Sequence, residues 1–203
     1  MALPDKTIDQ RILNAAKEEF LEKGYMKASL RQICADAGVT TGALYNRYAG
    51  KDELFRAIVS PFVEELNAMC VQVEEQDTVF AEDTNIEKIW QNPNESMPYL
   101  IDILYQNFDC FKLLICCAEG SCYENFFEDF VKSGTTGTFR VMKIAYEKGI
   151  AKYLPEEDEL HVLLTAYYAA IFEPIRHNYS KEKAIQYGET ISRFFNWRDV
   201  FGC

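Results

Sequence analysis

The chain has 203 residues, enough for one or two domains, and its 48% of hydrophobic residues can supply a substantial core. No stretch approaches the ~18 apolar residues that span a bilayer, and the N-terminal residues lack the apolar run of a signal peptide. These features argue against a membrane protein and lead us to expect a cytoplasmic one whose seven cysteines are reduced thiols.

The formal net charge of −11 is unevenly distributed along the chain. Residues 1–56 carry 9 Lys and Arg against 8 Asp and Glu, whereas residues 57–203 carry 12 against 24. The acidic second part would repel a polyanion such as DNA. Any contact with nucleic acid is therefore expected from the N-terminal part.

The first predicted element is a helix over residues 7–23. Apolar side chains recur there every four residues, at Ile8, Ile12, Ala16 and Phe20, which gives the helix one buried face. Gly24 is expected to end it. We interpret this helix as a support for the elements that follow.

Residues 29–48 predict two short helices joined by a tight turn. Ser29, with Gln32 three positions later, is typical of a helix N-cap, and Gly38 suits the left-handed conformation that ends a helix. Thr40 is expected to cap the second helix, in which Leu44 faces inward together with Tyr48. The side chains left outside are those of Thr41, Gly42, Tyr45, Asn46 and Arg47. A short exposed helix with these groups and little bulk at its start suits the major groove of DNA.

This stretch resembles the signature of the tetracycline-repressor (TetR) family of transcription regulators. The match runs from Ile33 to Tyr48 as ICADAGVTTGALYNRY and continues with KDEL at 51–54. The family pattern is apolar-Ala-x-x-Ala-Gly-Val-Ser/Thr-x-Gly-x-apolar-Tyr-x-x-Phe, then Lys-x-x-Leu. Cys34 replaces the usual alanine, Tyr48 replaces phenylalanine, and Arg47 stands where histidine or tyrosine is common. The resemblance covers roughly residues 5–66.

The resemblance implies an all-α fold in two parts. Residues 1–50 would form a three-helix helix-turn-helix DNA-binding domain, with its motif at about 29–48. Residues 51–203 would form a helical ligand-binding and dimerisation domain. The expected function is that of a transcriptional repressor that binds a palindromic operator in double-stranded DNA as a homodimer and is released by a small-molecule effector.

Contacts with DNA are expected mainly from the second helix of the motif. We expect Thr41, Asn46 and Arg47 to meet base edges or nearby phosphates, while Gly42 allows the backbone to approach closely. The residues expected near phosphates are Ser29, Thr40, Tyr45 and Lys51, with Lys27 and Arg31 adding charge nearby.

A further helix is predicted from Lys51 to about Gln76. Asp52 and Glu53 favour its positive N-terminal end, whereas Lys51 does not, so we interpret Lys51 as a ligand for a DNA phosphate at that end. Pro61 predicts a kink. The polar stretch that follows contains one short predicted helix, at about 86–90.

The second part predicts helices throughout and no strand, which brings the chain to about nine helices. These helices are expected at 98–118, 122–132, 139–148, 157–177 and 181–197, with 133–138 as an interruption. Its aromatic residues either form an ordinary core or line a cavity for an apolar or aromatic ligand. The residues proposed to line that cavity are Met69, Tyr99, Ile103, Phe111, Phe126, Phe130 and Tyr167.

The two C-terminal helices, 157–177 and 181–197, have apolar residues on more than one face. Those of the first helix are Leu163, Leu164, Tyr167, Tyr168, Ile171 and Phe172. A two-fold dimer in which these helices form a four-helix bundle would cover them, and family resemblance implies the same. The alternative is that all of them belong to the core of one chain.

Four cysteines cluster between Cys110 and Cys122, the others being Cys116 and Cys117. Their spacing matches no zinc site, and we interpret them as buried apolar residues, with a thiol- or redox-responsive regulator as the alternative. The sequence lacks catalytic motifs such as Gly-x-Ser-x-Gly or His-Glu-x-x-His, so we expect no enzyme, cofactor or metal. A second alternative is a helical protein-interaction module that keeps the fold without binding an effector.

Overall fold

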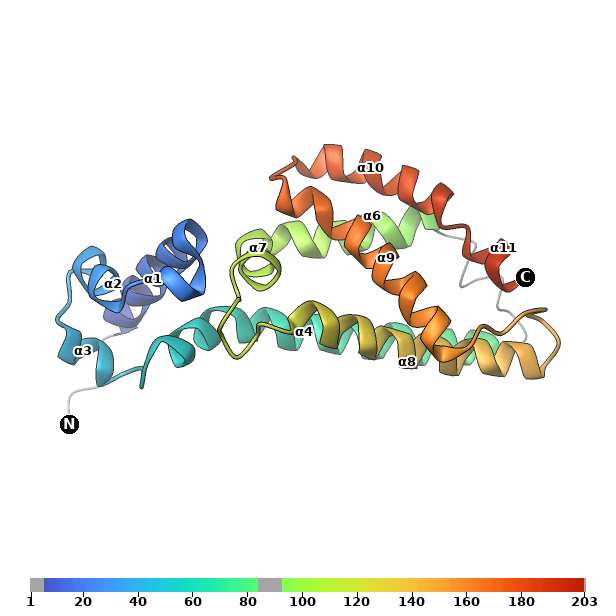
Figure 1. Ribbon diagram of the computed structural model, residues 1–203, viewed down its shortest axis with the longest axis horizontal. Coiled ribbons are helices and arrows are strands. Elements are labelled where there is room, and N and C mark those ends of the chain that lie inside the picture. The colour runs from blue at the N-terminus through green and yellow to red at the C-terminus, as the bar shows by residue number, and fades with distance from the viewer. Residues whose placement is uncertain (1–5, 84–92, 203) are drawn as a thin grey trace. The chain divides into compact units, whose positions relative to one another are not determined.

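The computed structural model describes residues 6–83 and 93–202 (Figure 1). All regular secondary structure in these ranges is α-helical, which confirms the predicted all-α class. The chain forms two compact units: the first contains residues up to 64 together with 107–126, and the second contains 65–106 together with 127 onward. The functional boundary predicted at residues 50/51 stays a prediction, because it concerns which residues meet DNA and effector.

The first unit contains α1 (Lys6–Lys27), α2 (Leu30–Ala37), α3 (Thr41–Tyr45), the first turns of α4 (Lys51–Glu82) and α7 (Phe108–Cys116). The predicted end of the first helix is confirmed, since Gly24 leaves the helical conformation with φ 73°. The predicted apolar face is confirmed as well. Its fully buried members are Ile12, Ala16 and Phe20.

Three aromatic rings connect α1 to α4 inside this unit. Phe20 packs edge-on against Phe55 with ring centroids 5.1 Å apart, and Tyr25 packs edge-on against Phe55 at 5.5 Å. Phe20 and Phe55 are fully buried. Because such pairs add to the free energy gained from burial, this cluster fixes the start of α4 against the helix that supports the motif.

The second unit contains the rest of α4 with α6 (Pro93–Gln106), α8 (Phe126–Glu147, from 127 onward), α9 (Glu157–Arg176), α10 (Lys181–Phe194) and α11 (Trp197–Phe201). Helix α10 packs against both α6 and α9 (Figure 1). The core is formed by Ala81, Val131, Val141, Met142, Ala145, Ala151, Leu160, Leu164 and Phe201.

The helix predicted over 98–118 is wrong, because the chain forms two helices there. Helix α6 ends at Gln106, Asn107 is non-helical with φ −116° and ψ 33°, and α7 begins at Phe108. The two helices belong to different compact units. Both helices bury apolar side chains, so the apolar pattern of the sequence continues across Asn107 and did not predict the break.

The interruption predicted at 133–138 is also wrong, because α8 continues through it. A Cβ atom at Gly134 would lie 3.4 Å from the ring of Tyr168, and one at Gly137 would lie 2.9 Å from the carboxylate of Glu74. The contact at Gly134 is an ordinary one, whereas the missing side chain at Gly137 lets the carboxylate of Glu74 lie against α8, and neither glycine ends the helix.

The remaining helix bounds differ from expectation in smaller ways. Helix α4 continues to Glu82 and contains Pro61, where the kink stays a prediction. The last predicted helix ends at Phe194 and a separate turn of helix, α11, follows it. The helix predicted at 86–90 lies outside the described residues. None of the described helices is both long and apolar enough to cross a membrane.

Candidate nucleic-acid interface

Helix α2 begins and ends as its sequence predicted. The hydroxyl of Ser29 accepts a hydrogen bond from the backbone N–H of Gln32 at 3.4 Å, and Gly38 takes the left-handed conformation with φ 62°. The side chain of Gln32 does not complete the capping box, because it donates to Asp36 instead. The partner of the Ser29 N–H is Glu19 on α1, whose carboxylate accepts at 3.0 Å.

Glu19 is a site residue that the sequence did not identify. Its side chain is buried, with 4% of the residue exposed, and its carboxylate also accepts a hydrogen bond from Lys23 at 2.8 Å. Burial alone would raise the pKa of Glu19, but the hydrogen bonds from Lys23 and the Ser29 N–H outweigh it and lower the pKa. Glu19 therefore fixes the start of α2 to α1 as an ionised group.

Helix α3 has five residues, and its buried residue is Leu44. Thr40 caps it by accepting from the Ala43 N–H at 3.1 Å. Leu44 is fully buried beneath it, and Tyr48 beyond its end is half-buried. The predicted outward-facing residues Thr41, Gly42, Tyr45 and Asn46 are all exposed. Hydroxyl, phenol and amide groups are thus all exposed to solvent on α3 or directly after it.

Arg47 lies at the end of the same turn but is less exposed than its neighbours. Its Nε donates to Oδ1 of Asp9 on α1 at 2.6 Å, and its Nη1 donates to the carbonyl oxygen of Ala43 at 3.1 Å. The side chains of Arg47 and Asp9 are 23% and 33% exposed. The guanidinium is therefore hydrogen-bonded to two groups within the first unit.

Lys51, at the start of α4, is likewise hydrogen-bonded to groups within the first unit. Its Nζ donates to the carbonyl oxygens of Met26 at 3.2 Å and Ala28 at 3.3 Å, and lies 4.6 Å from the centre of the Tyr25 ring. These acceptors at the end of α1 compensate for a cation at the positive end of α4. The predicted phosphate ligand is thus half-buried, and it connects two helices.

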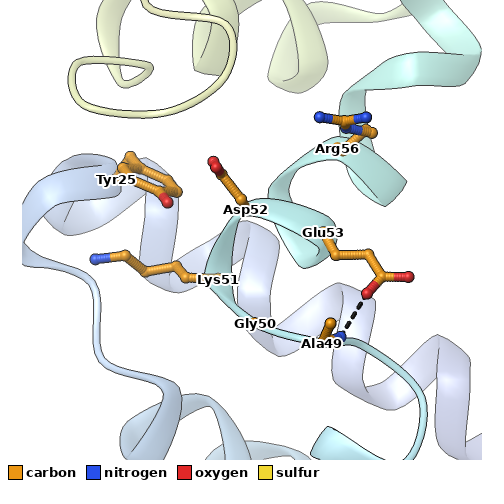
Figure 2. A pocket seen from close by; sticks show the side chains of 7 residues that line it. All are labelled: Tyr25, Ala49, Gly50, Lys51, Asp52, Glu53 and Arg56. Carbon is orange, nitrogen blue, oxygen red and sulfur yellow. Dashed lines mark hydrogen bonds between the residues drawn. The ribbon is translucent and has the colours of Figure 1, made fainter.

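A groove of about 640 Å³ opens beside this lysine (Figure 2). It is lined by Tyr25, Ala49, Gly50, Lys51, Asp52, Glu53 and Arg56. Glu53 accepts a hydrogen bond from the Ala49 N–H, and Asp52 accepts one from the Cys122 N–H at 3.1 Å. Burial, followed by the hydrogen bond and charge of Asp52, raises the pKa of Tyr25 to about 12. The groove carries both signs of charge, and the tyrosine stays protonated.

The other residues predicted near phosphates are accessible to solvent. Lys27, Ser29, Arg31 and Thr40 are all exposed. The N-terminal part of the first unit therefore offers two cationic side chains, Lys27 and Arg31, whose exposure exceeds that of Arg47 and Lys51.

The seven residues predicted to line a ligand cavity are divided between the two units. Phe111 and Phe126 lie in the first unit, in mutual contact at 6.4 Å between ring centroids. In the second unit Phe130 and Tyr167 both contact Tyr168, Ile103 is buried, and Tyr99 is 59% exposed. Neither the groove beside Lys51 nor a second pocket of about 320 Å³, around Cys116 and Glu119, includes any of the seven. The cavity stays a prediction.

Sequence reasoning missed a group of desolvated polar side chains in the second unit. Burial raises the pKa of Asp77 to about 6 and that of Tyr167 to about 12. Burial raises the pKa of Tyr168 further, with added contributions from Tyr167, Cys70 and Asp77. Tyr168 packs against Phe130 at 4.9 Å between ring centroids. Asp77 lies on α4 but one residue beyond the end predicted for that helix at Gln76, so its burial could not be inferred from the predicted pattern.

The cysteine cluster is only partly buried. Cys117 is buried and Cys110 is half-buried, with its Sγ 3.6 Å from the Ile58 carbonyl oxygen. Burial raises the pKa of both thiols. Cys116 and Cys122 are exposed, so the interpretation of all four as buried apolar residues is wrong for these two.

The prediction that one chain cannot cover the apolar residues of α9 is also wrong in part. Leu164, Ile171 and Phe172, which were expected to exceed what one chain can cover, are buried within a single chain. The exposed apolar residues on the two C-terminal helices are others: Val162 at 66%, Tyr187 at 39% and Phe194 at 82%. These three, rather than the predicted set, form the uncovered apolar surface of α9 and α10.

Comparison with known proteins agrees with this geometry. The profile of bacterial regulatory proteins of the tetR family matches residues 12–58, from α1 into α4. UidR of Escherichia coli (strain K12), an HTH-type transcriptional regulator, is 41% identical over 58 residues, which are 29% of this chain and 28% of UidR. BepR of Brucella suis biovar 1, an HTH-type transcriptional repressor, is 40% identical over 50 residues, 25% of this chain and 24% of BepR.

The matched segments thus span about a quarter of the length of these two relatives. Likeness over the whole chain is found among solved structures. A transcriptional regulator from Aquifex aeolicus VF5 has a TM-score of 0.59 at 17% identity, covering 93% of this chain and 99% of that one. At this identity the likeness establishes a shared fold.

Proposed function

Because this chain belongs to the tetR family of bacterial regulatory proteins, we propose that it is a transcriptional regulator that binds double-stranded DNA through α3. The observation that carries the proposal is the exposed face of α3. Thr41, Tyr45 and Asn46 present hydrogen-bonding groups to solvent on a helix held by the buried Leu44 and the capping Thr40. This is the surface that a major groove requires.

Contacts follow from the position of each exposed group. Thr41 and Asn46 would meet base edges, and the missing side chain at Gly42 would let the backbone approach the groove. The residues that would hold phosphates are Ser29, Thr40 and Tyr45, with Lys27 and Arg31 adding charge. The −12 balance of residues 57–203 confines this attraction to the first unit's N-terminal part.

The DNA-binding form is a homodimer joined through α9 and α10. The exposed apolar side chains Val162, Tyr187 and Phe194 support this, because a two-fold contact between these helices would remove them from water. Two copies would then present two α3 helices, with operator half-sites about one helical turn, ~34 Å, apart or at a multiple of it.

Regulation is by a small apolar or aromatic molecule bound in the second unit, which releases the protein from DNA. The aromatic residues there, with Phe130, Tyr167 and Tyr168 in mutual or shared contact, support a ligand of that class. A ligand can release the protein only if it binds better to the form that does not fit the operator. The printed name of BepR, a transcriptional repressor, supports repression as the effect of DNA binding.

Selection from a random duplex library tests the proposal. The wild-type chain should enrich a palindromic sequence, and its affinity should fall steeply as salt rises. Thr41→Ala with Asn46→Ala should abolish the preference for the enriched sequence, whereas Glu75→Gln, on the exposed surface of α4 in the second unit, should not. Binding to no duplex, or unchanged selectivity in the double variant, would favour a protein-interaction module that only keeps the fold.

A further inference from the structure

The orientation of α3 depends on few contacts. The helix has five residues and buries one side chain, that of Leu44. A helix this short is not stable by itself, because the cost of nucleation exceeds what so few hydrogen bonds return. Its direction must therefore be set by what holds its two ends. Thr40 caps the first end within the motif, which leaves the far end to be fixed by a contact from elsewhere.

The contact at the far end is made by Arg47. Its guanidinium joins the carbonyl oxygen of Ala43, inside α3, to the carboxylate of Asp9 on α1, 38 positions earlier in the chain. A charge-assisted hydrogen bond at 2.6 Å between two partly buried groups is among the stronger single contacts that a protein makes. It connects α3 directly to the supporting helix.

Breaking this contact to reach a base would be unfavourable for two reasons. Arg47 would have to give up two of its hydrogen bonds, and Asp9 would keep an uncompensated negative charge in a half-buried position. That charge would also lie near DNA phosphates, which repel it. With the pair intact, Arg47 neutralises Asp9 while DNA is bound.

We propose that Arg47 and Asp9 form a clamp that positions α3, so that Arg47 is a positioning residue and base discrimination rests with Thr41 and Asn46. This inference rests on the proposed function. It replaces the base contact that the sequence predicts for Arg47, and it assigns a role to Asp9, which no motif identifies.

The test compares specificity ratios, defined as the affinity for the enriched duplex divided by that for random duplex. The ratio removes the general effect of adding or deleting a charge near DNA. Asp9→Ala and Arg47→Ala should each lower it by about tenfold. The double variant should lose no more than the larger single loss, because either change alone already opens the clamp.

Base preference at each position separates a clamp from a base contact. For the clamp, Arg47→Ala weakens discrimination evenly across the operator, and the salt slope of the double variant equals that of the wild type because the pair has no net charge. For a base contact, Arg47→Ala removes discrimination at one base pair while Asp9→Ala leaves it intact, which would overturn the proposal. Asn46→Ala is the matched control and should change preference at a single position.

Two further measurements keep the outcome decisive. All binding assays use a buffer in which urea unfolding shows every variant to be folded. If Asp9→Ala or Arg47→Ala does not fold, Asp9→Asn or Arg47→Lys takes its place. If the wild type enriches no sequence, the proposed function fails, and the clamp is then judged from unfolding alone. Coupled losses of stability in the Asp9 and Arg47 cycle support it, whereas additive losses refute it.

Discussion

Replacing Asp77 with asparagine should stabilise the protein at neutral pH, because the carboxylate of Asp77 is held in a desolvated position on α4. Burial raises its pKa from the usual 3.8 to about 6. No hydrogen bond or ion pair from the described parts of the chain compensates its charge. The ionised form is therefore tolerated less well in the folded protein than in the unfolded chain.

The size and sign of the effect follow from proton linkage. The folded state binds the proton more tightly than the unfolded state, so the contribution of Asp77 to stability is fully present below pH 3.8. It is lost as pH rises to about 6 and beyond. A shift from 3.8 to about 6 corresponds to about 3 kcal/mol in total. Of this, about 1 kcal/mol should be lost between about pH 5.2 and about pH 7.5. Both pH values lie above the isoelectric region, so the protein carries a net negative charge in both measurements.

The assay is urea unfolding of the wild type and Asp77→Asn at both pH values. The difference in free energy of unfolding between the two proteins should grow by about 1 kcal/mol in favour of the variant as pH rises. Glu75→Gln, an exposed acid on the same helix, is the control and should show no such change. Parallel pH dependence of the wild type and Asp77→Asn would refute the assignment of a desolvated, uncompensated carboxylate.

Three other substitutions or titrations test separate surfaces. Lys51→Ala should weaken binding to all duplexes about equally and lower the salt slope by roughly 1 if the lysine also meets a phosphate, and an unchanged slope would restrict it to connecting α1 and α4. Phe194→Asp should convert a dimer to a monomer in sedimentation without lowering the monomer's stability, since this side chain is 82% exposed; a dimer that persists would place the interface elsewhere. Cys116 and Cys122 should react rapidly with a thiol reagent while Cys117 reacts only on unfolding, and loss of DNA binding after the rapid phase would support the thiol-responsive alternative.

The features that the sequence predicted correctly act within a few residues. Ser29 and Thr40 cap the helices that they precede, and Gly24 and Gly38 end the helices that they follow. Each outcome depends on the conformation or hydrogen bond of one residue and its neighbours, so a single sequence contains the necessary information. The exposure of Thr41 and its neighbours on α3 follows from the same local pattern.

The features that the sequence did not predict depend on partners far along the chain. Arg47 was assigned to DNA from its type, but its partner Asp9 is on another helix. Gln32 was expected to complete the cap of Ser29, but Glu19 occupies that position. The glycines of α8 were interpreted as an interruption because the residues that lie against them, Tyr168 at Gly134 and Glu74 at Gly137, belong to different helices. Propensity and spacing describe what a residue tolerates locally, whereas these outcomes were decided by tertiary contacts.

The hydrogen bond from the Ser29 amide to the buried Glu19 has a consequence for protein engineering. A chimera that transplants only residues 29–48 into a foreign scaffold would orphan that amide and discard the anchor of its first helix. The smallest portable cassette must therefore carry α1 along with the motif, and a graft that begins at Lys6 should retain its selectivity where a shorter one would not.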